Sequence, residues 1–273
     1  VNRWWICNDG RYDYPHVHNP ARLVGARQRK GGDTRELDFT GLADQLRAAL
    51  RQAGRLGAVL SPFLTLQEAY LLAGTIRQLD PQALLSLGPV PLAGEDERYP
   101  GGFTISKEKC PNRFGVERIL GRMAGGVIRF DHFVEQVAQG AIAGAWVSGG
   151  YRQGWIDEAT AAKFEQLRLL VVQDLFPSPL SQRATYELGG AAFAERDGSY
   201  VNRQHRLQSV AWAIRPPAGV RTEGSILWEL AGRAGLYDAA ATLRELAAEI
   251  PFFHPALGTI PETGLDLLVN QIA

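Results

Sequence analysis

The sequence predicts an α/β protein built on a doubly wound, mostly parallel, Rossmann-like sheet with helices on both faces and an irregular N-terminal lead-in. Two observations predict the sheet. Short runs that are apolar throughout recur along the chain, the strongest being residues 169–174, and segments of helical periodicity separate them. Strands without polar alternation are typical of a parallel sheet covered on both faces. Right-handed crossovers between such strands then produce the doubly wound arrangement.

The first part of the regular region shows this alternation. Apolar residues that share one face predict a helix over residues 42–50. Residues 56–61 and 83–87 are short apolar runs bounded by turn residues, typical of buried strands. Thr65 and Glu68 have the spacing of a capping box, so a second helix is expected between these two strands.

The same alternation continues after an interruption. Residues 88–126 carry eight glycines and four prolines and are expected to form a long excursion. Further helices are predicted over residues 116–123, 130–140, 157–166, 224–234 and 239–249, and further strands over residues 145–148 and 169–174.

The N-terminal residues follow no regular pattern. Residues 1–36 mix aromatic, proline and arginine residues without a helical or strand period. Pro15 and Pro20 each lack a ladder donor, so we expect this segment to pack along the outside of the domain rather than to join its sheet. The chain is accordingly divided into an irregular segment, residues 1–36, and an α/β domain, residues 37–273.

Composition argues against several classes of function. The 273 residues contain 29 basic and 29 acidic side chains, so the net charge is zero and no global attraction to nucleic acid is expected. No apolar run reaches the roughly 18 residues that a membrane span needs. Two cysteines are too few for a disulfide scaffold and fit a reducing compartment.

Common catalytic motifs are missing from the sequence: it has no phosphate loop, H-E-x-x-H, G-x-S-x-G or G-x-G-x-x-G pattern. Gly149 and Gly150 follow a predicted strand, where a ligand could sit, but a tight turn with positive φ is the favoured interpretation. Glu195 and Asp197 could form an acid–base pair, although solvated loop carboxylates are commoner. Cys7 could ligate iron, while its local chemistry alone favours a buried free thiol.

Three separated stretches carry a resemblance to a known family. Residues 4–12 (Trp-Trp-Ile-Cys-Asn-Asp-Gly-Arg-Tyr) resemble the element W-x-C-D-x-G-R-F, and residues 111–117 (Pro-Asn-Arg-Phe-Gly-Val-Glu) are similar to P-N-x-x-G-[AV]-E. Residues 170–179 and 194–208 resemble V-V-Q-D-x-F-x-[ST] followed by A-E-x-D-G-T-[FY]-x-N-x-x-x-R-x-Q. These elements are similar to those of the molybdopterin oxidoreductase superfamily, in its large iron–sulfur (G-type) subunit of respiratory complex I.

The resemblance implies a metal-binding role for Cys7, as the last of four cysteine ligands of a [4Fe–4S] cluster. The other three ligands would lie upstream, so a cluster is expected only with an upstream segment and none on this chain alone. Cys110 lies inside the second motif and is taken as incidental.

Two departures from the family pattern bear on molybdenum. Active members carry a metal ligand after the helix that begins at Thr65, but here only Asp80 and Ser86 remain as candidates. Residues 185–190 (Thr-Tyr-Glu-Leu-Gly-Gly) replace the family's A-D-V-V-L-P. The resemblance therefore implies a decayed molybdenum site without bound molybdopterin.

The resemblance also indicates which residues would form a vestigial cofactor-binding loop on the pterin side. These residues are Asp174, Ser178, Asp197, Gly198 and Asn202. Asp174 and Asn202 are expected to lie close together beyond the carboxyl ends of the parallel strands, where doubly wound sheets place ligands.

The function implied is that of a non-catalytic scaffold domain in an electron-transferring iron–sulfur subunit of an NADH dehydrogenase (complex I-like) assembly. Its partners would be the other subunits of that respiratory complex. They would hold it in the cytoplasm, peripheral to the inner membrane, with no insertion of its own. The alternative is a fragment of an active molybdopterin oxidoreductase, such as a formate dehydrogenase relative.

Overall fold

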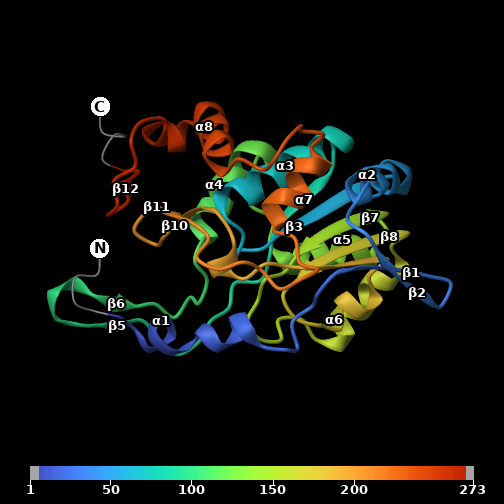
Figure 1. The fold of residues 1–273 in the computed structure, drawn as a ribbon, viewed down its shortest axis with the longest axis horizontal. Helices are drawn as coiled ribbons and strands as arrows, with labels where there is room; N and C mark the ends of the chain where they lie inside the picture. Colours follow the sequence, from blue (N-terminus) through green and yellow to red (C-terminus); the bar gives the residue numbers. More distant parts are fainter. Residues whose placement is uncertain (1–5, 269–273) are drawn as a thin grey trace.

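A seven-stranded sheet forms the centre of the molecule (Figure 1) in the computed structural model, which describes residues 6–268. The strand order is β2-β1-β9-β8-β7-β3-β4. The bounds are β1 (Ala26–Lys30), β2 (Asp33–Leu37), β3 (Leu56–Leu60), β4 (Leu84–Leu87), β7 (Gly144–Ser148), β8 (Leu169–Asp174) and β9 (Tyr186–Gly189). Strands β9 to β4 pair in parallel, whereas β1 pairs antiparallel with both neighbours. The predicted α/β class with a mostly parallel sheet is confirmed.

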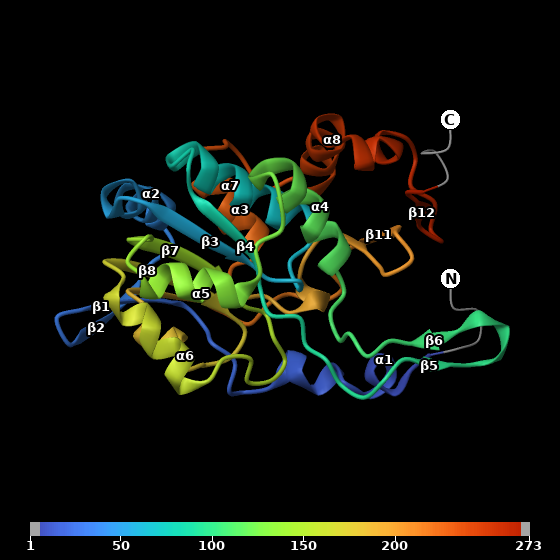
Figure 2. The same ribbon diagram turned by 180° about the vertical axis from the view of Figure 1, so that it is seen from behind.

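Helices cover both faces of this sheet (Figures 1 and 2). One face carries α2 (Leu42–Ala53), α3 (Leu66–Leu79), α4 (Arg113–Ala124), α7 (Glu223–Leu230) and α8 (Ala239–Glu249). The other face carries α5 (Phe130–Ala138) and α6 (Glu158–Ala162). Alternate residues of β8 enter the two cores: Val171 packs with the first group, and Leu170 and Val172 with the second. Burial on both faces explains why these strands are apolar throughout.

The capping box at the start of α3 is present as expected. Thr65 Oγ1 accepts a hydrogen bond from the Glu68 backbone N–H at 3.2 Å, and Glu68 Oε2 accepts one from the Thr65 N–H at 2.9 Å. Both residues are fully buried. The cap therefore places a carboxylate in the protein interior, beside the carboxyl end of β3.

No helix within residues 6–268 is both long and apolar enough to cross a membrane.

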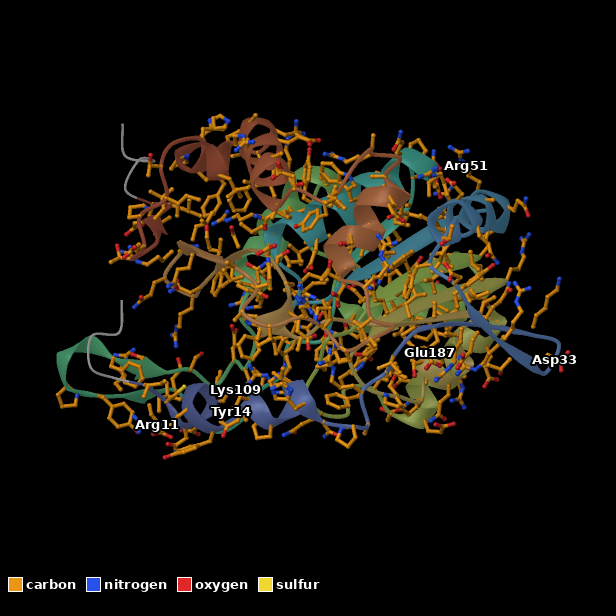
Figure 3. The ribbon with its side chains drawn as sticks, viewed as in Figure 1. Arg11, Tyr14, Asp33, Arg51, Lys109 and Glu187 are labelled. Atoms are coloured by element: carbon orange, nitrogen blue, oxygen red, sulfur yellow. The ribbon has the colours of Figure 1, made fainter. Side chains whose placement is uncertain are left out.

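The expectation that residues 1–36 stay outside the sheet is wrong for their second half. Strand β1 lies between β9 and β2, and the turn at Gly31 and Gly32, with φ of 61° and 93°, closes the β1–β2 hairpin. Figure 3 shows Asp33 at the outer end of this hairpin and Glu187 within the sheet. The sequence Ala-Arg-Gln-Arg-Lys has no apolar alternation, but Arg29 forms an ion pair with the buried Glu187.

The described residues before β1 do run along the outside of the molecule. They include α1 (Asn8–Tyr12) and a 3-10 helix at Tyr14–His18, which lie along the lower edge in Figure 1. Because β2 ends at Leu37, the sheet itself crosses the proposed boundary at residues 36–37. The division into segments 1–36 and 37–273 stays a prediction.

Two further regions leave the central body. Within the excursion of residues 88–126, β5 (Glu97–Arg98) and β6 (Thr104–Ile105) form a projecting hairpin (Figure 2), and α4 follows. A small antiparallel sheet orders β10 (Gly198–Val201), β11 (Arg206–Val210) and β12 (Leu265–Asp266). The sequence analysis predicted none of these strands, because each is short and contains no continuous apolar run.

Candidate functional site

The carboxyl ends of the parallel strands form a polar edge. Ser148, the last residue of β7, accepts a hydrogen bond from the Ser61 N–H at 2.9 Å and donates one to the Val59 carbonyl at 2.7 Å. Asp174 ends the neighbouring strand β8. Ligands of open α/β sheets bind outside the carboxyl ends of the strands, so this edge is the candidate ligand-binding site.

Asp174 is buried at this edge, with 1% of its surface exposed. Its Oδ1 accepts hydrogen bonds from the Gly150 N–H at 2.9 Å and the Leu175 N–H at 2.7 Å. Its Oδ2 accepts one from the Trp155 indole Nε1 at 2.8 Å. Burial raises the pKa of the Asp174 carboxyl to about 6, against the opposing effect of these three donors. The carboxylate is thus satisfied by its own chain.

The two glycines after β7 serve different purposes. Gly150 has a φ of 87°, which confirms the expected tight turn at this residue. At Gly149 a Cβ would lie 2.1 Å from Asp174 Oδ1, so only glycine leaves room for the carboxylate. The strand end and the glycine pair together form a closed loop around Asp174.

Two cavities open next to this loop, and Phe63 and Arg152 line both. The larger has a volume of about 500 Å³ and also contacts Tyr151 and Trp155, whose rings stack with centroids 4.9 Å apart. The smaller has a volume of about 170 Å³ and reaches to Arg196 and Tyr200. Only the larger falls within the range of ordinary small-molecule sites.

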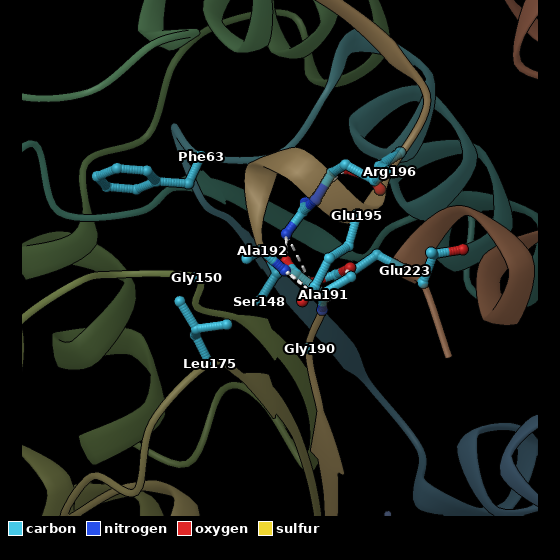
Figure 4. A network of polar contacts seen from close by, with 12 residues as sticks. Phe63, Ser148, Gly150, Leu175, Gly190, Ala191, Ala192, Glu195, Arg196 and Glu223 are labelled. Carbon is cyan, nitrogen blue, oxygen red and sulfur yellow. Dashed lines mark hydrogen bonds and ion pairs between the residues drawn. The ribbon is translucent and has the colours of Figure 1, made fainter. Parts of the chain in front are cut away.

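Arg196, which lines the smaller cavity, belongs to a buried cluster of charges. Arg196 donates from Nη1 to Glu68 Oε2 at 3.0 Å and from Nη2 to Glu223 Oε1 at 3.2 Å. Figure 4 shows Arg196 and Glu223 meeting beside Ala191, whose N–H also donates to Glu223 Oε2 at 3.2 Å. Burial above all raises the pKa of Glu223 to about 7, and the nearby Glu68 adds to this.

A second buried ion pair ties the outer N-terminal segment to the same loop. Arg22 donates to both carboxylate oxygens of Glu195, at 2.6 and 2.7 Å, and to the carbonyls of Val17 and Gly190. The two partners have 2% and 1% of their side chains exposed. Glu195 is therefore committed to a structural pair and does not form an acid–base pair with Asp197, which accepts from the Trp212 N–H at 2.9 Å.

The structure places the sequence-predicted loop residues in separate local roles. Ser178 exchanges hydrogen bonds with Ser181 and is buried. Gly198 lies against Thr65, since a Cβ there would be 2.5 Å from Thr65 Cγ2. Asn202 Oδ1 accepts from the backbone N–H groups of Gln204 and Arg206, at 2.9 and 3.0 Å.

Within residues 6–268 no hydrogen bond joins Asp174 to Asn202, and their expected proximity stays a prediction. Asp174 ends a strand of the main sheet, whereas Asn202 shapes the turn between β10 and β11 in the small sheet. Gly198 is the first residue of β10, and Asp197 directly precedes it. Asp174 lies at the carboxyl edge of the sheet, as expected from the end of its strand.

The two cysteines are both free thiols and lie in different surroundings. Cys7 Sγ accepts a hydrogen bond from the Gly10 N–H at 3.3 Å. Burial raises the pKa of the Cys110 thiol to about 12, and Glu108 adds to this. Residues 6–268 contain no group of three or more histidine, cysteine or acidic side chains that could hold a metal ion.

Sequence reasoning missed the buried partners Arg22, Arg196 and Glu223. One signal was available: Glu195 and Arg196 follow residues 189–194, Gly-Gly-Ala-Ala-Phe-Ala, a stretch rich in small apolar residues. Charges that adjoin such a stretch are candidates for burial and pairing. Their partners lie far away in the sequence, so pairing itself had no local signal.

Comparison with known proteins identifies the class. The family model described as Molybdopterin oxidoreductase matches residues 15–233. The chain therefore belongs to the molybdopterin oxidoreductase family.

Several relatives are similar over parts of their length. The chain is 25% identical over 249 residues to the NADPH-Fe(3+) oxidoreductase subunit alpha of Geobacter sulfurreducens, covering 85% of this chain and 25% of that protein. It is 24% identical over 225 residues to formate dehydrogenase H of Escherichia coli, covering 72% and 31%. It is 29% identical over 147 residues to the mitochondrial NADH-ubiquinone oxidoreductase 78 kDa subunit of Neurospora crassa, covering 53% and 18%. Two of these relatives are named as subunits of larger oxidoreductases, and the chain spans less than a third of each.

Proposed function

We propose that this chain is a non-catalytic scaffold module of an electron-transferring iron–sulfur subunit, in an NADH dehydrogenase assembly similar to complex I. Family membership and the similarity to the Neurospora crassa 78 kDa subunit support an electron-transfer setting. The other subunits of that assembly would be its partners and would hold it in the cytoplasm, peripheral to the inner membrane.

One observation carries the proposal: the chain's own donors satisfy the buried carboxylate at the carboxyl edge of the sheet. Asp174 receives three N–H donors from Gly150, Trp155 and Leu175, so the carboxylate has no strong need for a ligand. The smaller cavity beside it, about 170 Å³, is below the size of ordinary cofactor sites. These two observations support the proposal that the chain holds no pterin dinucleotide beside Asp174.

The role proposed for Cys7 is that of one ligand in a [4Fe–4S] cluster whose other ligands lie outside the described residues. One thiolate does not fit a complete cluster, which takes one ligand for each iron. The thiol is half-buried and, among the described residues, accepts a weak hydrogen bond from the Gly10 N–H, so binding iron would break little there.

A second candidate function is that of an active molybdopterin oxidoreductase related to formate dehydrogenases. The larger cavity favours it, because about 500 Å³ between Phe63, Tyr151 and Trp155 could hold a flat ring system. In the sequence Cys110 adjoins Lys109, which lines this larger cavity, and Pro111, which lines the smaller cavity. A thiol at this position is therefore a candidate metal ligand for the second function. The neutral state of the Cys110 thiol at pH 7 argues against it as a ready metal ligand.

Metal analysis separates the two functions. The full-length protein is purified with its partner subunits, and iron, acid-labile sulfide, molybdenum and tungsten are measured per chain. The proposal expects iron and sulfide without molybdenum or tungsten. Either of these metals at one atom per chain would establish the second candidate instead.

A further inference from the structure

The buried Glu68–Arg196–Glu223 cluster has two carboxylates for one guanidinium. The side chains of Arg196, Glu68 and Glu223 are 5%, 0% and 4% exposed. If all three were ionised, one negative charge would stay unbalanced in the interior. An uncompensated buried charge is costly, and proteins commonly avoid it by taking up a proton.

The surroundings supply no second cation in residues 6–268. Arg22 is held by Glu195 in a one-to-one pair, and Arg152 forms an ion pair with Asp13. Among the other charged groups nearby, Asp174 and Asp197 are acidic and cannot neutralise a carboxylate. The N-termini of α3 and α7 stabilise Glu68 and Glu223 in part, because both residues lie in the first helical turn.

The remaining titratable groups around the cluster are tyrosines, and they stay neutral. Burial raises the pKa of Tyr200 to about 12. Burial also raises the pKa of Tyr237, with Glu68 adding to the effect. Neither phenol carries a charge at neutral pH, so the proton balance near neutrality rests on the carboxylates.

The cluster joins three elements that are distant in the sequence. Glu68 comes from the first turn of α3, Glu223 from the first turn of α7, and Arg196 from the loop of residues 190–196. The loop is held from both sides, because Ala191 N–H donates to Glu223 while its carbonyl accepts from Arg196. Ala191 and Arg196 also line the smaller cavity. A change of charge in the cluster therefore acts directly on the cavity wall.

We propose that this cluster is a proton-dependent latch, which binds one proton near neutral pH and thereby keeps loop 190–196 and α7 docked against α3. Loss of the proton with rising pH leaves the excess charge and loosens the loop. The pKa of Glu223, which burial above all raises to about 7, fits a proton that leaves in this range. The latch goes beyond the proposed function and does not depend on it.

Hydrogen exchange followed by mass spectrometry tests the latch in the purified full chain. Exchange of peptides covering residues 188–200 and 222–231 is measured between about pH 5.5 and 8.5 and corrected for the intrinsic chemical rate. We expect corrected protection to fall severalfold as pH rises through about 7. Flat corrected protection across this range would overturn the proposal.

Two matched variants locate the proton. Glu68→Gln removes the excess charge and keeps the capping box, because glutamine suits that position as well as glutamate. Glu165→Gln is the control: it removes a carboxylate that pairs with Arg183 outside both measured peptides. We expect Glu68→Gln to abolish the pH step and Glu165→Gln to retain it. If Glu68→Gln fails to fold, Glu223→Gln takes its place, and an unchanged pH step in either cluster variant would overturn the latch.

Discussion

The indole Nε1 of Trp155 donates a hydrogen bond to Asp174 Oδ2 at 2.8 Å, in a buried site where burial raises the pKa of the carboxyl to about 6. A carboxyl whose pKa is raised by folding stabilises the protein fully below its unfolded pKa of about 3.9. That contribution is lost as pH rises through about 6. Trp155 limits the loss, because its N–H favours the charged form.

Replacing Trp155 with phenylalanine should therefore destabilise the protein in a pH-dependent way. At about pH 8 we expect an added loss of about 1.5–3 kcal/mol for the hydrogen bond to a charged group. At about pH 4.5 the hydrogen-bond contribution should be smaller, so the remaining destabilisation comes from lost packing. The pKa of Asp174 should also rise further, because the Trp155 N–H no longer favours its charged form. Urea denaturation at the two pH values checks this. Trp228→Phe is the control, since its indole donates to the Ala234 carbonyl and its cost should not change with pH.

Gly149→Ala should disrupt the closed loop around Asp174. The added Cβ would lie 2.1 Å from the carboxylate, and overpacking of this kind costs about 1–3 kcal/mol or more. Gly154→Ala is the matched control, because a Cβ there would meet nothing within 4 Å. Thermal unfolding of both variants measures the difference. Equal melting temperatures would contradict the close approach of the strand ends.

The Arg22–Glu195 pair should show strong coupling. Arg22→Met leaves Glu195 buried without its partner, which we expect to cost about 3–5 kcal/mol. The double variant Arg22→Met with Glu195→Met removes both charges and should cost clearly less than the two single changes added together. A double-mutant cycle by urea denaturation gives the coupling free energy. A value near zero would mean that the N-terminal segment is held by packing alone.

The last prediction concerns iron. In a longer form of the protein that binds a [4Fe–4S] cluster, Cys7→Ser should remove or destabilise one cluster, because a hydroxyl is a poor ligand for its irons. Cys110→Ser should leave iron and acid-labile sulfide unchanged. The 273-residue chain alone should bind no stoichiometric iron. A cluster that survives Cys7→Ser would rule out the role proposed for this residue.

Local patterns were sufficient for much of the fold. Strand β8 was predicted over its full range, 169–174, because burial on both faces requires an uninterrupted apolar run. The start of α3 was predicted from Thr65 and Glu68, since a capping box is a contact across three residues. The position of Asp174 at the carboxyl edge of the sheet followed from the end of its strand. Each of these inferences needs only neighbours in the sequence.

Pairing across long distances was decided by the tertiary structure. Strand β1 is polar, and its place in the sheet rests on contacts such as that of Arg29 with Glu187, 158 positions away. The position of Asn202 in a turn likewise depends on β10 and β11, which pair in a small sheet apart from the main one.

The buried charges show the same division most clearly. The capping box identified Glu68 as the start of a helix. Its contact with Arg196 spans 128 positions, and no periodic pattern in the sequence predicts it. Helices and apolar strands follow from short-range geometry and burial, which the order of residues records directly. Ion pairs in the core follow from which elements pack together, and only the folded chain brings those elements into contact.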